Sequence, residues 1–222
     1  MVVGAPTAAL LAKNGITSDA VALPSCGETG TAPTGDGPGL ADDVAAVTTV
    51  LDQGHPTVVV AHSYGGMVAA QAATHPAVRH LVYISSFLPN IGDSLAALSG
   101  TADPVPVQPH PDGSVSVHIE DRAIFDNRFL HDVADAALVR GAHDRLTAQS
   151  SAVFGAEVTA AGWQHIPSTY LVCADDRSTS PALQREHATR AKHKVELDTG
   201  HHPFLSRPDL VAASLREIAS ET

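Results

Sequence analysis

The chain has 222 residues, of which 44% are hydrophobic and 4% aromatic, so it is long enough for one ordinary domain with a core of mainly Ala, Val and Leu. The formal net charge of −11, without a Lys/Arg run, argues against nucleic acid or a membrane as partner. Two cysteines, Cys26 and Cys173, make no disulfide framework and predict reduced thiols in a cytoplasmic protein.

The N-terminal part of the chain predicts a helix, a strand and a second helix. MVVGAPTAALLAKNG has no basic lead and no typical cleavage site, so we expect no signal peptide. Residues 5–14 predict a short helix that ends at Asn14-Gly15. DAVAL at 19–23 predicts a strand, and apolar residues at helical spacing predict a helix from Leu40 to Leu51.

The middle of the chain begins with further α/β elements and then changes character. Residues 57–61 predict a strand, a helix is expected from just after Ser63 to about residue 75, and HLVYIS at 80–85 predicts another strand. Between 87 and 165 several prolines interrupt the rhythm. Within this insertion GSVSVHIE (113–120) alternates like a hairpin strand, and 131–151 look helical.

The last third returns to alternating strands and helices. Strands are predicted at 169–174 and 194–198, and helices at 181–191 and from Pro208 onward. This alternation indicates one α/β domain over 1–222, with a mostly parallel sheet, helices on both faces and a single insertion at about 87–165.

Ser63 lies where the strand 57–61 should turn into a helix. Ala61-His-Ser-Tyr-Gly65 is a variant of the nucleophile elbow G-x-S-x-G, with alanine at the first glycine. Small residues two before and two after the serine are expected to relieve crowding in a strained turn. The turn would expose the hydroxyl and aim the N–H of Tyr64 at a developing oxyanion. The alternative is a serine that caps an ordinary helix.

A nucleophilic serine needs a base, and the base needs a carboxylate that orients it. Asp175-Asp176 follow the strand 169–174, and His201-His202 follow the strand 194–198. We favour Asp176 as the acid and His201 as the base. Their neighbours are the alternatives, and a helix-capping acid is the structural alternative for both aspartates.

The chain has 13 histidines, so most must be ordinary surface or loop residues. His62 is expected to pack or to form a hydrogen bond. The histidines of the insertion show no metal-ligand spacing, and we therefore predict no metal.

With these residues assigned, the sequence resembles the α/β-hydrolases. More narrowly, it resembles the small esterases that include plant methyl-salicylate esterase, hydroxynitrile lyases and their bacterial relatives. The matching pieces are VVVAHSYGGM (58–67), HLVYISSFLP (80–89), FLHDV (129–133), IPSTYLVCADDRSTSPALQ (166–184) and ELDTGHHPFLSRP (196–208).

The resemblance implies Ser63 as nucleophile, Asp176 as acid, His201 as base, no cofactor, and residues 87–165 as a cap over a pocket. Hydroxynitrile lyases of this group carry lysine after the catalytic histidine, and His202 at that position argues against cyanohydrin chemistry. The implied reaction is hydrolysis of a small carboxylic ester. Candidates for an apolar lining, which could equally be core of the cap, are Phe87, Leu88, Phe125, Phe129, Phe154 and Trp163.

The sequence departs from this family at its start. Members normally open with a strand that ends in His-Gly and a loop that supplies a second oxyanion N–H. That strand would lie between 19–23 and 57–61, so these two strands must pair directly or leave backbone groups open. Three explanations stay open: a truncated or wrongly started chain, replacement of the strand by Val2-Val3-Gly4-Ala5, or loss of catalysis.

The main hypothesis is a serine esterase. The alternative is a non-catalytic ligand-binding protein, and lactone, thioester or C–C cleavage on the same triad is a third possibility.

Overall fold

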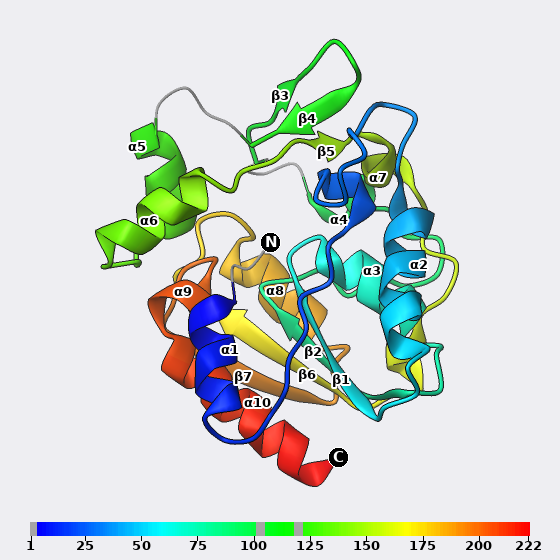
Figure 1. The fold of residues 1–222 in the computed structure, drawn as a ribbon, viewed down its shortest axis with the longest axis vertical. Coiled ribbons are helices and arrows are strands. Elements are labelled where there is room, and N and C mark those ends of the chain that lie inside the picture. Colours follow the sequence, from blue (N-terminus) through cyan, green and yellow to red (C-terminus); the bar gives the residue numbers. More distant parts are fainter. Residues whose placement is uncertain (1–3, 101–104, 118–121) are drawn as a thin grey trace.

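The predicted alternation of strands and helices is present in the computed structural model, which describes residues 4–100, 105–117 and 122–222. Val2-Val3 and the end of the 113–120 segment lie outside these ranges. A parallel sheet has the strand order β1-β2-β6-β7 (Figure 1). Its strands are β1 (Thr57–His62), β2 (Val78–Ile84), β6 (Ser168–Cys173) and β7 (His193–Leu197).

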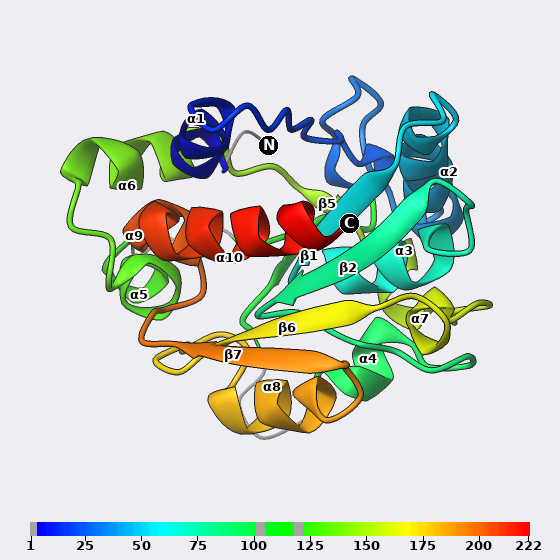
Figure 2. The same cartoon turned by 90° about the horizontal axis from the view of Figure 1, so that it is seen from below.

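Helices cover both faces of this sheet, as expected (Figure 2). The side chains of each strand alternate between the two faces. In β2, Leu81 and Tyr83 face one apolar cluster, whereas Val82 and Ile84 face the other. The first cluster includes residues of α2 (Leu40–Leu51), α3 (Gly65–Ala72) and α8 (Pro181–Ala188). The second includes residues of α1 (Ala5–Ala12) and α10 (Pro208–Glu221).

Most of the insertion between β2 and β6 lies beyond the carboxyl ends of the strands, and its last part returns to the amino end of β6 (Figure 1). Its helical segments are α4 (Leu95–Leu98), α5 (Arg122–Phe125), the π-helix Asp126–Leu130, α6 (Ala136–His143), α7 (Ala152–Gly155) and the 3-10 turn Gly162–Gln164. A small antiparallel sheet joins β3 (Gln108–Pro109), β4 (Ser114–Ser116) and β5 (Gln149–Ser150). The continuous helix expected over 131–151 is therefore wrong, because its end pairs with β4 as a strand.

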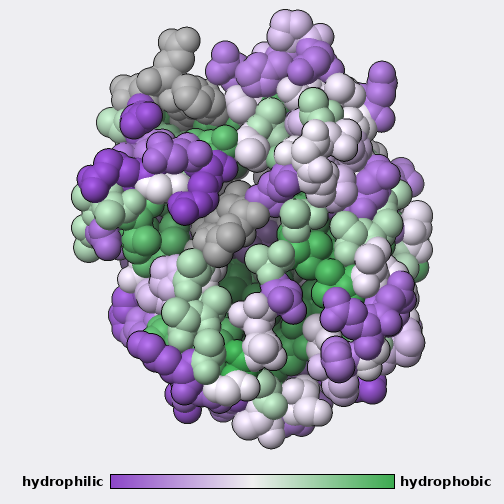
Figure 3. Space-filling view, in the orientation of Figure 1, coloured by the Kyte–Doolittle hydropathy of each residue, from purple (hydrophilic) through white to green (hydrophobic). Residues whose placement is uncertain are grey.

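The strand predicted at 19–23 is also wrong. This segment is extended and ends in a 3-10 turn, Pro24–Cys26, but it joins no strand. Within the described chain, β1 pairs with β2 alone and forms an edge of the sheet. In the described residues β1 therefore does not pair with residues 19–23, and its outer side stays open. Val60 of β1 is 45% exposed, and Figure 3 shows apolar surface recessed near the centre of this view.

The remaining helical element, α9 (Pro203–Ser206), directly precedes α10. Across the ranges that the structure describes, no helix combines the length and the apolar character that a membrane crossing requires.

Candidate active site

Ser63 occupies a strained turn directly after β1. Its φ of 51° lies in the left-handed region, which residues other than glycine rarely adopt. Two hydrogen bonds to the main chain of Ser63 hold this conformation. The Ser63 carbonyl accepts a hydrogen bond from the Ser86 hydroxyl at 2.7 Å, and its N–H donates to the carbonyl of Ile84 at 3.4 Å. The turn therefore depends on the end of the neighbouring strand β2.

The motif indicates a required glycine at position 65, whereas the structure requires one at position 66. A Cβ added to Gly65 would lie 3.9 Å from the Ala61 Cβ, which is an ordinary contact. A Cβ added to Gly66 would lie 2.0 Å from the Phe87 carbonyl oxygen. Positions 61 and 65 do face one another, as expected, whereas the close approach of α3 to the next chain segment requires Gly66.

Asp176 and His201 form a buried hydrogen-bonded pair. The His201 Nδ1 lies 2.8 Å from Asp176 Oδ2, and the two side chains are 4% and 0% exposed. Asp176 follows β6, and His201 follows β7, which is the next strand in the sheet. Asp175 is exposed, so of the two adjacent aspartates Asp176 is the one that contacts the imidazole.

The Asp176 carboxylate receives hydrogen bonds on both oxygens. Oδ1 accepts the N–H groups of Ser178 at 2.6 Å and Thr179 at 3.1 Å, and Oδ2 accepts the Gln184 amide at 2.8 Å. Burial alone would raise the pKa of Asp176. The positive charge of His201 and the hydrogen bonds outweigh burial and hold this pKa below its ordinary value. The carboxylate is therefore charged at neutral pH and can orient the imidazole.

Ser85 joins this pair from β2. Its hydroxyl donates to Asp176 Oδ2 and lies 3.0 Å from His201 Nδ1. Like Ser63, Ser85 has a positive φ, of 44°. Two residues at the ends of adjacent strands are thus held in unusual backbone conformations at the same edge of the sheet.

The strand register brings Ser63 and His201 to one edge, where His62 lies between the two chain segments. The His62 Nε2–H donates to the main-chain carbonyl of His201 at 2.8 Å, and the rings of these two histidines lie 4.6 Å apart between centroids. Among the described side chains, the Ser63 hydroxyl and His201 Nε2 form no hydrogen bond. Such contacts are often long in enzymes without substrate and tighten in the bound complex.

His202 does not contact the carboxylate. Its Nδ1–H donates to the Phe129 carbonyl at 2.9 Å. Burial, followed by the charge of His201, lowers the pKa of His202 to about 3 and that of His62 well below its ordinary value. Both neighbours of His201 are therefore neutral at pH 7.

Tyr64, the predicted oxyanion donor, directly precedes α3. No acceptor for this N–H occurs in the part of the chain that the structure describes. The side chain points elsewhere: its hydroxyl donates to the buried Asp43 at 2.7 Å, and Ser25 donates to the same carboxylate at 2.6 Å. Burial raises the pKa of Tyr64 far above its ordinary value, so this hydroxyl stays protonated.

The apolar candidates divide into two groups. The Phe129 ring lies 5.6 Å from the His201 ring and 4.8 Å from that of Phe125, so these two phenylalanines belong to the edge that carries His201. Phe87, Leu88 and Phe154 pack in the apolar clusters beside the sheet instead. Phe87 and Phe154 join the cluster around Met67, and Leu88 is fully buried between the sheet and its helices.

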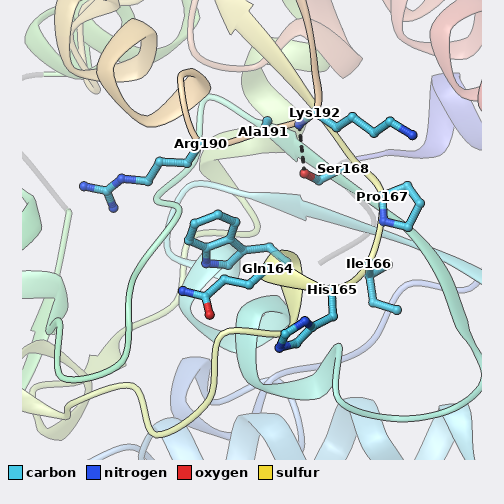
Figure 4. A pocket seen from close by; sticks show the side chains of 9 residues that line it. Gln164, His165, Ile166, Pro167, Ser168, Arg190, Ala191 and Lys192 are labelled. Atoms are coloured by element: carbon cyan, nitrogen blue, oxygen red, sulfur yellow. Dashed lines mark hydrogen bonds between the residues drawn. The ribbon is translucent and has the colours of Figure 1, made fainter.

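Trp163 lies toward the amino end of β6, not at its carboxyl end. Its indole N–H donates to the Pro89 carbonyl at 2.6 Å, and it lines a surface groove of about 360 Å³ (Figure 4). Ser168, the first residue of β6, lines the same groove together with Arg190 and Lys192. The structure therefore does not bring Trp163 to the edge that carries Ser63.

Sequence reasoning missed several residues that hold the site. Ser85 and Ser86 come directly after a buried strand, at the position that singled out Asp176 and His201, and this signal could have found them. Asp132 accepts the Gly200 N–H at 2.6 Å and so fixes the residue before His201. Gln184 and Asp132 carry no such signal, because they lie in a helix and in the insertion.

Comparisons with known proteins bear on the family and the fold of the chain. The model of the alpha/beta hydrolase family matches residues 3–214. An alpha/beta hydrolase of Aspergillus novofumigatus is 29% identical, in a comparison that covers 91% of this chain and 85% of that protein.

Solved structures share the fold over almost the whole chain. A pyrethroid hydrolase from Sphingobium faniae is 18% identical, with a TM-score of 0.78 and coverage of 99% of this chain and 92% of that one. A methylesterase from Arabidopsis is 16% identical, with a TM-score of 0.76 and coverage of 100% and 94%.

Proposed function

Because the chain belongs to the alpha/beta hydrolase family, we propose that it is a serine hydrolase that cleaves a small carboxylic ester through an acyl-enzyme on Ser63. The observation that carries this proposal is the convergence of a strained serine and a hydrogen-bonded Asp–His pair. Ser63, Asp176 and His201 follow three strands of one parallel sheet and reach the same edge. A helix-capping serine would need neither partner.

In the proposed reaction His201 Nε2 accepts the Ser63 hydroxyl proton while Oγ bonds to the ester carbonyl carbon. The alcohol leaves with that proton, and the acyl group stays on Ser63. Water then attacks the acyl-enzyme while His201 again accepts a proton, and this proton passes to Ser63 Oγ as the acid is released. Asp176, charged because its pKa is lowered, stabilises the imidazolium at both steps.

Tyr64 and the phenylalanines would bind the reacting group. The Tyr64 N–H is the donor that we assign to the oxyanion, and the hydrogen bond from its hydroxyl to Asp43 anchors the residue. Phe125 and Phe129, next to His201, favour an apolar substituent on the ester. The small-ester preference also draws on the methylesterase of similar fold.

A fluorophosphonate probe tests the proposal, because it phosphonylates an activated serine. We expect labelling of the peptide that contains Ser63, and no labelling in Ser63→Ala, whose fold is checked by circular dichroism. A panel of small methyl and p-nitrophenyl esters should be hydrolysed by the wild type alone. A folded wild type that takes no label, hydrolyses no ester and yet gains thermal stability from small apolar ligands would instead be a binding protein.

A further inference from the structure

Three imidazoles come together at the proposed active site. One ring nitrogen each of His62, His201 and His202 lies within 4.8 Å of the other two. The ring centroids are 4.6 Å apart for His62 and His201, 5.1 Å for His62 and His202, and 4.8 Å for His201 and His202. The cluster joins the end of β1 to the loop after β7, so the fold rather than the local sequence assembles it.

Each of these rings directs one nitrogen outward to an oxygen acceptor. His62 Nε2 donates to the His201 carbonyl, His201 Nδ1 to the Asp176 carboxylate, and His202 Nδ1 to the Phe129 carbonyl. Because a carbonyl or carboxylate accepts only, these contacts place the ring proton on the bonded nitrogen. The other nitrogen of each neutral ring therefore carries a lone pair.

This is the arrangement that metal-binding histidines use in proteins. Such a histidine almost always donates its second ring N–H to a carboxylate or a main-chain carbonyl, which fixes the tautomer.

We propose that His62, His201 and His202 form a three-histidine site for a divalent transition-metal ion such as Zn²⁺, and that the bound ion switches off the esterase. Three imidazoles and a water complete the tetrahedral shell that Zn²⁺ prefers. The ion binds His201 Nε2, the atom that takes the Ser63 proton, so metal binding and proton transfer exclude one another.

Metal binding requires the three rings to move closer together. Zn–N bonds of about 2.0–2.1 Å in a tetrahedral site place the nitrogens about 3.4 Å apart, against the spread of up to 4.8 Å here. His62 and His202 are partly accessible, and His202 lies in the loop before α9. Turning these two rings while His201 stays bonded to Asp176 would close the site.

Metal binding in this proposal does not depend on the proposed function, whereas inhibition does. Binding is therefore measured first, by titration with Co²⁺, followed through its visible absorption, and with Zn²⁺ by calorimetry. We expect affinity to fall at least tenfold in His62→Asn and in His202→Asn. The control His165→Asn, an exposed histidine of the distant groove, should leave affinity unchanged.

Two results would overturn the site: a wild type that binds no metal at micromolar concentration, or variants that bind as tightly as the wild type. If the variants do not fold, ¹⁵N-histidine spectra of the wild type decide. Zn²⁺ should shift the imidazole signals of these three residues, and a shift confined to the other histidines would refute the site.

Ester turnover then tests the switch. Zn²⁺ should lower turnover at least tenfold, and EDTA should restore it. Metal bound at the three histidines with turnover unchanged would overturn the inhibition. Metal bound to a protein that hydrolyses no ester and takes no fluorophosphonate label would support the site and contradict the proposed function instead.

Discussion

Acidification from pH 7 to pH 5 should destabilise the fold through the two neutral histidines beside His201. Burial and the charge of His201 lower the pKa of His202 to about 3, so the folded protein keeps this ring neutral at pH 5. In the unfolded chain its pKa returns to about 6.5. The unfolded state then binds more protons, and stability falls as the pH drops below about 6.5.

The size of this effect follows from the two pKa values. Each pH unit between them changes the free energy of unfolding by about 1.4 kcal/mol per histidine, so the 1.5 units from 6.5 to 5 remove about 2 kcal/mol for His202. His62, whose pKa is also lowered, should add to this loss. Asp176 has a lowered pKa, so its contribution is lost only at more acid pH, as the pH falls through that lowered pKa.

Urea unfolding at pH 7 and pH 5 measures this loss for the wild type and for His202→Asn. Each protein is compared with itself, so a general loss of stability in the variant does not affect the result. The pH-dependent loss should be smaller by about 2 kcal/mol in His202→Asn. The control His55→Asn replaces an exposed histidine and should behave like the wild type. An equal loss in the wild type and in His202→Asn would refute the reasoning.

Three further predictions concern the packing around the site. Gly66→Ala should lose about 3 kcal/mol of stability or more in urea unfolding, because its Cβ would lie 2.0 Å from the Phe87 carbonyl oxygen. Gly65→Ala is its matched control and should lose no stability; equal losses would contradict the close approach. Ser85→Ala removes a hydrogen bond to Asp176, and a loss of about 1.4 kcal/mol of transition-state stabilisation would lower kcat about tenfold. Unchanged kinetics in Ser85→Ala would exclude this role. Gly200→Ala would place a Cβ 2.6 Å from Asp132 Oδ1 and displace His201, so ester turnover should drop while the far-ultraviolet spectrum stays native; full turnover would show that the loop adapts.

The α/β elements that carry the site could be predicted from the sequence because their signals are local. A run of β-branched residues ended by polar ones placed β1 within one residue, the strand predicted at 194–198 lies within one residue of β7, and helical spacing gave the bounds of α2. The acid and base were predictable for the same reason, since Asp176 and His201 directly follow buried strands of a parallel sheet. The structure shows the contact between them, whereas their catalytic roles stay predictions.

What could not be predicted depends on contacts between distant segments. DAVAL at 19–23 has the composition of a strand, but a strand needs a hydrogen-bonding neighbour, and composition does not show whether one exists. The helix expected over 131–151 failed because the pairing of β5 with β4 overrode local preference. The approach of His62 to His201 was hidden likewise, because 139 residues separate the two.

The position of β1 at the sheet edge has a consequence for how the protein responds to warming. Local opening in a protein costs least where few backbone hydrogen bonds must break, and in the described fold β1 is held along one side only. The segment that presents Ser63 should therefore fray, and its amide protons exchange, while β2 and β6, which are paired on both sides, are still intact. Heat inactivation would then set in below the temperature at which the core melts, and thermal tolerance of activity would be governed by the edges of the sheet and not by its centre.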